Sequence, residues 1–488
     1  MTLRDLLHGV TAAPVAAVPI AGVAAHSKQV RPGDLFVAMP GAERDGYEFI
    51  EEAVSRGAAA VVAERLPAQL PRACPCVVVR DTREALAMIA EKFYGHPTKR
   101  LKLLGVTGTN GKTTITYLLK AILQAAGERA GLLGTIVYQI GQRTVPSTNT
   151  TPGPLELQRY FAQMVAEGIE WCAMEVSSHA LAQGRVARLH FAAGIFANLG
   201  SDHLDYHKTI EAYAAAKRKL FDQLRPDGYA VLNVDDSFGR TLAETLPMRS
   251  VVTYGLEQAS RVRVRHVECS WDGIMLTLES PWGILPLSTP LLGRHNAYNV
   301  AAAAATLLAH GIAPSAIQLG LAELPPVPGR MDVVPNDAGI RVLIDYAHTS
   351  DALRLVLLSL RELTRGRVLV VFGCGGNRDG TKRPIMGRMA SLLADHVILT
   401  SDNPRRETPE QIIRQIQSGF APSFQQYQIV PDREQAIAAA LALAQPHDTV
   451  LIAGKGHETY QVFDHVTVPF SDRDVVERVF NSRQSVAI

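Results

Sequence analysis

Cysteines and long apolar runs are scarce in this chain of 488 residues, and its charge is almost balanced. The five cysteines stand far apart, and Cys74 and Cys76 do not have a metal-ligand spacing. This usage excludes a disulfide framework and favours a reducing compartment. No uninterrupted apolar run approaches the roughly 20 residues that a spanning helix needs. A net charge of +2 gives no general attraction to nucleic acid or to a membrane surface.

An apolar, alanine-rich segment at residues 10–25 resembles a signal peptide, because Arg4 precedes it. Pro14 and Pro19 interrupt the segment, and Asp5 lies in the region that should be basic. We therefore interpret it as structured or loop sequence of a cytoplasmic protein.

Two breaks in the chain indicate three domains. Gly-His-Pro at 95–97 ends a helical pattern, and three prolines with a glycine interrupt residues 324–331. The length predicts two to four domains. We expect domains at residues 1–97, 98–328 and 329–488.

Alternating apolar and helical patterns predict an α/β protein. The first domain is expected to be a small α/β unit, and the second to have a mostly parallel sheet. In the third, four apolar strands each run into a polar loop, at 342–345, 367–372, 396–400 and 449–453. This pattern predicts a doubly wound, Rossmann-like domain that binds ligands at the carboxyl edge of its sheet.

The stretch 103–114 predicts a phosphate-binding loop. An apolar strand leads into a glycine-rich turn, then Gly-Lys-Thr-Thr and a helical pattern, which together form a site for phosphate anions. Lys112 would reach the terminal phosphates, and the Thr113 hydroxyl would bind Mg²⁺. Val106 stands where the strict pattern has its first glycine. The predicted nucleotide-binding residues are Gly108, Thr109, Asn110, Gly111, Lys112, Thr113 and Thr114.

Two later strands end in polar groups. Glu175 ends an apolar run and could be the second anchor of Mg²⁺, although many buried strands end at a solvated glutamate. His203 and His207 lie four residues apart, so a zinc pair is conceivable, but no further ligand stands at suitable spacing. Mg²⁺ prefers oxygen, so the residues alone leave the histidines' role open. The basic residues near Lys217 suggest a solvated helix face.

Two glycine-bearing segments carry weaker signals. Residues 373–376 follow a strand, but they lack the third glycine of a dinucleotide fingerprint, which argues against NAD. Asn296 opens an alanine-rich helix and could either hold a ligand or cap the helix.

Taken together, five motifs resemble the Mur ligases of peptidoglycan synthesis. They are Gly-Thr-Asn-Gly-Lys-Thr-Thr at 108–114, Met-Glu-Val-Ser-Ser-His at 174–179, Asp-His-Leu-Asp-Tyr-His at 202–207, Asp-Tyr-Ala-His at 345–348 and Asp-Asn-Pro-Arg at 402–405. The resemblance covers nearly the whole chain and is weakest in the first hundred residues. Ser350 departs from the family, where proline commonly follows the His-Thr pair, but it lies outside the implied contacts.

The resemblance implies a domain for a UDP end, a central P-loop ATPase and a Rossmann-like domain for an amino acid. The implied activity is ATP-dependent addition of meso-diaminopimelate to UDP-N-acetylmuramoyl-L-alanyl-D-glutamate through an acyl phosphate, with Mg²⁺. Lys112, Lys217 and His203 would be catalytic, and Lys217 would carry a carbamate. The implied Mg²⁺ ligands are Thr113, Glu175, His203 and Lys217.

The resemblance also implies three sets of binding residues. Asn296, Arg330 and Asp345 would complete the ATP site. The UDP-muramoyl dipeptide would contact Ser27, Ala42, Glu43, Arg44, Asn149, Thr150, Thr151, Ser177, Gln183 and Arg185. Diaminopimelate would contact Arg378, Asp402, Asn403, Pro404, Arg405, Gly454 and Glu458. Arg405 offers a planar fork for a carboxylate, and the acids can bind ammonium groups.

Three alternatives remain open. A lysine-adding relative usually has an acidic residue where Asn403 stands, and a folylpolyglutamate synthase shares the P-loop core. A regulatory P-loop NTPase would have no need of the amino-acid pocket. We expect a cytoplasmic monomer that acts on small molecules and neither binds nucleic acid nor inserts into a membrane.

Overall fold

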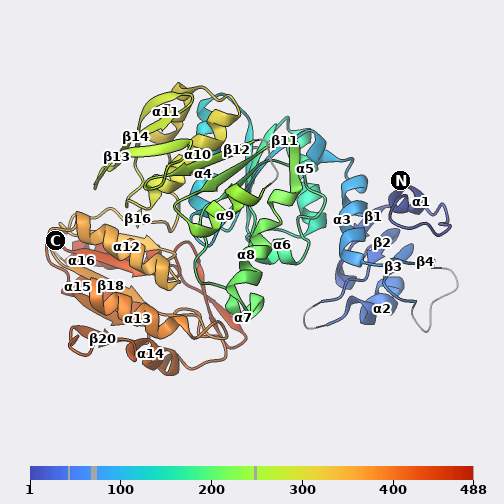
Figure 1. The fold of residues 1–488 in the computed structure, drawn as a ribbon. Helices are drawn as coiled ribbons and strands as arrows, with labels where there is room; N and C mark the ends of the chain where they lie inside the picture. The colour runs from blue at the N-terminus through green and yellow to red at the C-terminus, as the bar shows by residue number, and fades with distance from the viewer. Residues whose placement is uncertain (42–43, 67–73, 247–249, 487–488) are drawn as a thin grey trace.

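The computed structural model describes residues 1–41, 44–66, 74–246 and 250–486, which form three separate main sheets (Figure 1). The small N-terminal sheet lies at one end of the molecule, and the C-terminal sheet lies beside the central one. The expected α/β class with mostly parallel sheets is confirmed.

The first sheet has four parallel strands in the order β1-β2-β3-β4. Its buried strands and helices share two apolar clusters, one on each face. The elements are α1 (Leu3–Leu7), β1 (Gly22–Ala24), β2 (Asp34–Val37), α2 (Ile50–Ser55), β3 (Ala60–Ala63), β4 (Cys76–Val78) and α3 (Thr82–Phe93). The alanine-rich segment at 10–25 thus ends in a strand of this sheet.

The central sheet has eleven strands in the order β15-β14-β13-β12-β11-β10-β5-β9-β6-β7-β8. Its middle is parallel, and both edges are antiparallel. The strands are β5 (Lys102–Thr107), β6 (Ala130–Leu133), β7 (Val137–Ile140), β8 (Arg143–Pro146), β9 (Trp171–Glu175), β10 (Phe191–Phe196), β11 (Leu224–Asn233), β12 (Val251–Gly255), β13 (Val262–Ser270), β14 (Gly273–Ser280) and β15 (Gly283–Thr289).

Helices cover both faces of the central sheet. One apolar cluster joins α4, α10 and α11 to the sheet, and another joins α5, α6 and α9 to the opposite face. The helices are α4 (Lys112–Ala125), α5 (Pro154–Ala166), α6 (Ser178–Ala182), α7 (Leu204–His207), α8 (Ile210–Arg218), α9 (Ser237–Thr245), α10 (Asn296–Ala309) and α11 (Pro314–Ala322). Short 3₁₀ turns are η1 (Ser27–Gln29), η2 (Gly46–Phe49), η3 (Pro97–Lys99) and η4 (Phe221–Gln223).

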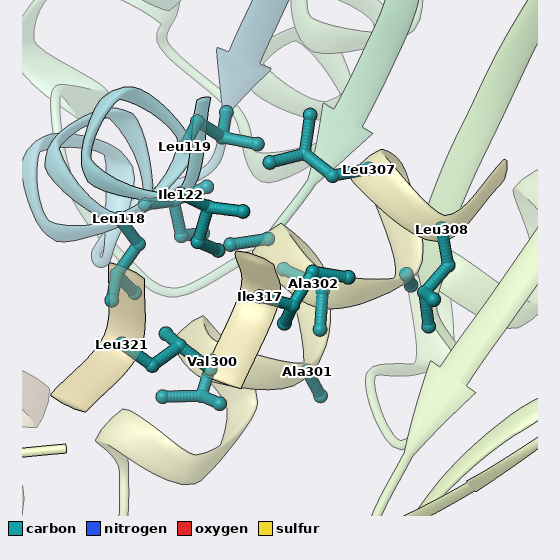
Figure 2. Packing of buried hydrophobic residues seen from close by; sticks show 14 of the residues in the cluster. Leu118, Leu119, Ile122, Val300, Ala301, Ala302, Leu307, Leu308, Ile317 and Leu321 are labelled. Atoms are coloured by element: carbon teal, nitrogen blue, oxygen red, sulfur yellow. The ribbon is translucent and has the colours of Figure 1, made fainter. Parts of the chain in front are cut away.

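The packing of α4 against α10 and α11 holds in place the helix that follows the glycine-rich loop (Figure 2). Leu118 and Ile122 of α4 are fully buried against a cluster that includes Ile317 of α11. Each such side chain contributes about 1.5–3 kcal/mol on burial. At Gly320 of α11, an added Cβ would lie 2.5 Å from the Cα of Ile122, so the close approach of the two helices requires glycine there.

The third sheet has the order β16-β17-β21-β18-β19-β20 and is parallel except at β16. Helices α12, α13 and α14 cover one face, and α15 and α16 the other, which is the doubly wound arrangement. Its elements are β16 (Asp332–Val333), β17 (Arg341–Asp345), α12 (Ser350–Leu363), β18 (Val368–Phe372), α13 (Lys382–Leu393), β19 (His396–Leu399), α14 (Pro409–Gln417), β20 (Tyr427–Ile429), α15 (Arg433–Leu443), β21 (Thr449–Ala453) and α16 (Asp472–Val486), with the hairpin β22 (Tyr460–Phe463) and β23 (Val466–Pro469) beside it.

The four C-terminal strands predicted from the sequence are therefore confirmed as β17, β18, β19 and β21. Within the described ranges, none of the helices is both long and apolar enough to cross a membrane.

Candidate active site

Three neighbouring strands of the central sheet bring the predicted phosphate and metal residues together. Strand β5 lies between β9 and β10, and Val106 of β5 is in register with Glu175 of β9 and Ile195 of β10. Parallel neighbours end at the same edge of a sheet. The glycine-rich loop, Glu175 and the segment leading to His203 therefore meet at the carboxyl edge.

The glycine-rich loop links β5 to α4. Gly111 has a φ of +89°, and an added Cβ would lie 2.5 Å from Oδ1 of Asn299, so a side chain is excluded there. The Lys112 ammonium donates to the carbonyls of Gly108 and Thr109 at 3.0 and 2.9 Å. Burial lowers the pKa of Lys112. Val106, which replaces the first glycine of the strict pattern, lies inside β5 and is fully buried. The turn itself therefore does not need a glycine at this position.

Glu175 is almost wholly buried and is surrounded by hydrogen-bond donors. Its Oε1 accepts from the Thr113 hydroxyl at 2.9 Å and from the Thr135 amide at 2.7 Å. Its Oε2 accepts from the Thr135 hydroxyl at 3.0 Å. The paired oxygens of Thr113 and Glu175 suit a hard cation such as Mg²⁺.

His203, in the histidine-rich segment, lines the same cavity as Thr113 and Glu175. The His203 ring centroid is 4.7 Å from that of His179. Burial lowers the pKa of His203 to about 4, so its imidazole is neutral at physiological pH and has a lone pair for a metal ion. His207 makes a hydrogen bond between its Nε2 and the Ser178 hydroxyl at 3.0 Å.

The zinc alternative lacks a third ligand. Among the described residues, no group of three or more histidine, cysteine or acidic side chains could hold a metal ion. A closed zinc site requires such a group. Mg²⁺ retains several waters and binds substrate phosphates, so the sparse oxygen set fits Mg²⁺ better.

Lys217 is buried in α8, whereas the nearby Lys219 is exposed. The expectation of a solvated basic face is therefore wrong for Lys217, because this side chain points into the protein. Its ammonium nitrogen lies 4.2 Å from the centroid of the Tyr213 ring. Burial and then the Lys112 charge lower the pKa of Lys217 well below its ordinary value.

Arg330, just before β16, and Asp345, at the end of β17, reach the same place. Arg330 Nη2 donates to the Thr113 hydroxyl at 3.0 Å. The Asp345 carboxylate accepts from the Met331 and Ala347 amides, each at 2.7 Å, and burial raises its pKa. Asp345 thus orders the linker that carries Arg330.

A cavity of about 240 Å³ joins these groups. It is lined by residues 109–114, Glu175, Ser177, Asp202, His203, Asn296, Asn299, Arg330 and Asp345, among others. All the predicted nucleotide and metal positions line it except Gly108 and Lys217. Asn299 was missed from the sequence, yet its amide donates to Asn296 Oδ1 at 2.6 Å. The sequence does contain a signal for Asn299, because residues three positions apart on a helix lie side by side and Asn299 follows Asn296 at this spacing.

The residues predicted for the muramoyl dipeptide lie beside Glu175. Thr151 donates its hydroxyl to the Glu175 carbonyl at 2.8 Å and to the Ser177 hydroxyl at 3.3 Å. Arg185 donates to the Thr151 carbonyl at 3.2 Å and to Gln183 Oε1 at 2.9 Å.

Two more members of that set complete the cluster. The Thr150 and Thr135 hydroxyls lie 3.1 Å apart, which connects Thr150 to the Glu175 network. Asn149 contacts the Tyr138 hydroxyl through its backbone. The structure therefore brings all six central-domain residues of this set together.

The predicted uridine-end residues are less connected. The Ser27 hydroxyl is buried and donates to Glu52 at 2.7 Å. Arg44 is exposed and lies over the Phe49 ring at 4.4 Å. Ala42 and Glu43 fall outside the described residues. This part of the site stays a prediction.

The predicted amino-acid residues converge at the carboxyl edge of the third sheet. Arg405 Nη1 donates to the Gly376 carbonyl at 2.8 Å. Burial and then the charge of Arg378 lower the pKa of Arg405, while Asp402 and Glu458 oppose the shift, so these four groups share one electrostatic environment.

Close packing at two glycines and a hydrogen bond from the Asn403 amide connect the other members of this cluster. An added Cβ at Gly454 would lie 2.7 Å from Oδ2 of Asp402, and the Pro404 carbonyl packs against Gly376. Asn403 Nδ2 donates to Glu458 Oε2 at 2.9 Å. Seven residues from three loops thus form one cluster of mixed charge.

Family comparisons divide the chain into three matched segments. The Mur ligase family catalytic domain matches residues 19–94, the Mur ligase middle domain 106–307, and the Mur ligase glutamate ligase domain 329–456.

Curated relatives match over almost their full length. A UDP-N-acetylmuramoyl-L-alanyl-D-glutamate–2,6-diaminopimelate ligase of Geobacillus kaustophilus is 45% identical over 463 residues, 94% of each chain. One of Halalkalibacterium halodurans is 43% identical over 99% of each chain. A solved structure with the same enzyme title is 32% identical, with a TM-score of 0.70 over 99% of both chains. MurF from Acinetobacter baumannii, at 18% identity and a TM-score of 0.68 over 98% of each chain, shares the fold.

Proposed function

Because this chain belongs to the Mur ligase family, we propose that it joins meso-diaminopimelate to UDP-N-acetylmuramoyl-L-alanyl-D-glutamate at the expense of ATP, in the synthesis of peptidoglycan precursors. The observation that carries the proposal is the cluster of Arg405, Asp402 and Glu458 at the edge of the third sheet. It offers a fork for a carboxylate beside two anions that can each bind an ammonium group, and the far end of diaminopimelate carries one carboxylate and one ammonium.

The three domains divide the substrates among them. Residues 1–97 hold the UDP end, residues 98–328 bind ATP and the acceptor carboxylate, and residues 329–488 bind the incoming amino acid. Each assigned segment contains one main sheet, and the ATP cavity is lined from both the second and the third segment. ATP and amino acid can therefore be brought together between domains.

The chemistry begins with activation of a carboxylate. A carboxylate acylates poorly until one of its oxygens can leave as phosphate, so the acceptor's glutamate side chain takes the terminal phosphoryl group of ATP and ADP leaves. Lys112 and the amides of the glycine-rich loop stabilise the charge on that group during transfer. The amine of the amino acid then attacks the acyl carbon, phosphate leaves, and the amine proton is lost.

Thr113, Glu175, His203 and Lys217 would hold Mg²⁺, which supplies charge neutralisation around the phosphates. Thr113 and Glu175 already place their oxygens 2.9 Å apart, and the neutral His203 can donate a lone pair. The lowered pKa of Lys217 favours a neutral amine, which can add to carbon dioxide and lose a proton. The resulting carbamate is an anion, whereas an ammonium in its place would repel a cation.

The protein acts as a cytoplasmic monomer on small molecules, without nucleic acid and without membrane insertion. Its five cysteines are free thiols, as a reducing compartment favours.

The test is phosphate release from ATP in the presence of the UDP-muramoyl dipeptide, with diaminopimelate, with lysine or with neither. Release should require an amino acid and should be faster with diaminopimelate. Release that does not depend on any amino acid would refute the ligase activity, and preference for lysine would refute the substrate.

A further inference from the structure

Lys455 is a fully buried cation in the loop that follows β21. It stands between Gly454 and Gly456, whose φ values are +111° and +54°. An added Cβ at Gly456 would lie 2.8 Å from Cβ of Tyr346. The two glycines permit a tight turn that directs the lysine side chain inward.

The Lys455 ammonium contacts two residues of the proposed amino-acid site. It donates to Glu458 Oε2 at 2.8 Å and to Asn403 Oδ1 at 3.3 Å. It also lies 5.4 Å from the centroid of the Tyr460 ring. The Lys455 side chain is fully buried, whereas 16% of the Glu458 side chain is exposed, so the ammonium contacts Glu458 from the buried side.

These contacts fix the orientation of the Asn403 amide. Its Oδ1 accepts from Lys455 and from the Val462 amide at 3.0 Å, while its Nδ2 donates to Glu458 Oε2 at 2.9 Å. A reversed amide would set its NH₂ group against two donors. Lys455 and Asn403 both use the same carboxylate oxygen of Glu458. In the described part of the chain, Oε1 of Glu458 accepts no hydrogen bond and can receive an ammonium group.

Stability alone gives a poor reason for this lysine. A buried ammonium is costly to desolvate, and one carboxylate oxygen with one more distant amide oxygen compensates it incompletely. The buried pair of Arg433 and Asp472 differs, because two hydrogen bonds of 2.7 and 2.8 Å join the guanidinium to both carboxylate oxygens. An apolar side chain of similar length would fill the Lys455 position at lower cost.

We propose that Lys455 is a positioning residue for amino-acid selectivity: its ammonium holds Glu458 and orients Asn403, so that the site prefers diaminopimelate to lysine. The inference rests on the proposed function. The far end of diaminopimelate is a zwitterion of zero net charge, whereas the far end of lysine carries one positive charge. Removal of the buried cation makes the site one unit more negative, which favours lysine relative to diaminopimelate.

The experiment measures kcat/KM for diaminopimelate and for lysine in the full-length Lys455→Met variant, with ATP and the UDP-muramoyl dipeptide saturating. We expect the KM for diaminopimelate to rise about tenfold and the ratio of the two kcat/KM values to fall about tenfold. The KM for ATP should stay within about twofold. Lys455→Arg, which keeps the charge, should retain most of the ratio. Arg414→Met, on the exposed face of α14, is the matched control.

A double-mutant cycle with Glu458→Gln separates positioning from a merely structural role. If Lys455 acts through Glu458, the double variant should discriminate no worse than Glu458→Gln alone. The inference would be overturned if the losses of selectivity in the two single variants multiplied in the double variant. It would also be overturned if Lys455→Met raised the KM for all substrates uniformly, or left the ratio of the two kcat/KM values unchanged. If the methionine variant does not fold, Lys455→Gln removes the same charge and is compared in the same way. Wild-type enzyme that prefers lysine would instead refute the proposed function.

Discussion

Arg330 donates a hydrogen bond of 3.0 Å to the Thr113 hydroxyl, although the two residues are 217 positions apart in the chain. The same hydroxyl donates to Glu175 at 2.9 Å. Arg330 lies just before β16 of the third sheet, and Thr113 is the second residue of α4. One hydroxyl therefore connects the segment before β16, the glycine-rich loop and the acid at the end of β9.

Replacing Arg330 with methionine should weaken the use of ATP. A hydrogen bond to a charged group contributes about 1.5–3 kcal/mol, so kcat/KM for ATP should fall by roughly 10- to 150-fold. Steady-state kinetics with the other substrates saturating measure this effect. Arg388→Met, on the exposed side of α13, is the control, and an equal, small effect of both variants would contradict the role of Arg330.

Replacing Lys217 with alanine should abolish turnover, because the missing group is the anion formed from its buried amine. Short carboxylates such as formate or acetate should restore part of the rate, since they can occupy the space and carry the charge. Lys219→Ala is the control, because Lys219 is exposed two residues away. A rate that Lys217→Ala leaves unchanged would exclude the carbamate.

Replacing Arg405 with alanine should raise the KM for diaminopimelate far more than the KM for ATP. Truncation of one partner of a buried charged pair costs about 2–5 kcal/mol. Arg405→Lys should recover little of the loss, because an ammonium cannot grip a carboxylate with two parallel hydrogen bonds. Equal weakening of diaminopimelate and ATP would show that Arg405 does not recognise the amino acid.

The free energy of unfolding should fall as the pH drops from about 6.5 to about 4. Burial lowers the pKa of His310 to about 4, and its ring packs edge-on against Trp171 and Tyr229. Between the two pKa values the unfolded state binds more protons than the folded state, so acid favours unfolding.

Urea denaturation at pH 7.5, 6.0 and 5.0 measures this dependence. His310→Gln, which cannot titrate, should reduce the slope by about 1 kcal/mol per pH unit. An unchanged slope in His310→Gln would contradict the assignment.

Much of this site could be predicted from the sequence because motifs occupy the ends of strands. Glu175 and the 108–114 loop follow apolar runs, and parallel neighbours place such ends at one edge. Continuous apolar runs are typical of buried strands. The ends predicted from these runs agree within one residue with the observed ends of β17, β18, β19 and β21.

The sequence could not predict which side of a helix is buried, nor which residues far apart in the chain are in contact. Lys217 and Lys219 have identical side chains two positions apart, and only packing of α8 buries the first. Lys455 stands among polar loop residues, and its burial depends on Gly454, Gly456 and a partner 52 residues away, Asn403. No local pattern encodes such a long-range contact.

Isotope transfer tests the central claim, ligation through an acyl phosphate, most directly. The UDP-muramoyl dipeptide is prepared with ¹⁸O at both oxygens of its terminal glutamate side-chain carboxylate and incubated with ATP and diaminopimelate, and the products are analysed by mass spectrometry. The mechanism predicts ADP, an amide product and one ¹⁸O atom in each inorganic phosphate released. Phosphate without ¹⁸O, or ¹⁸O found in AMP, would contradict it.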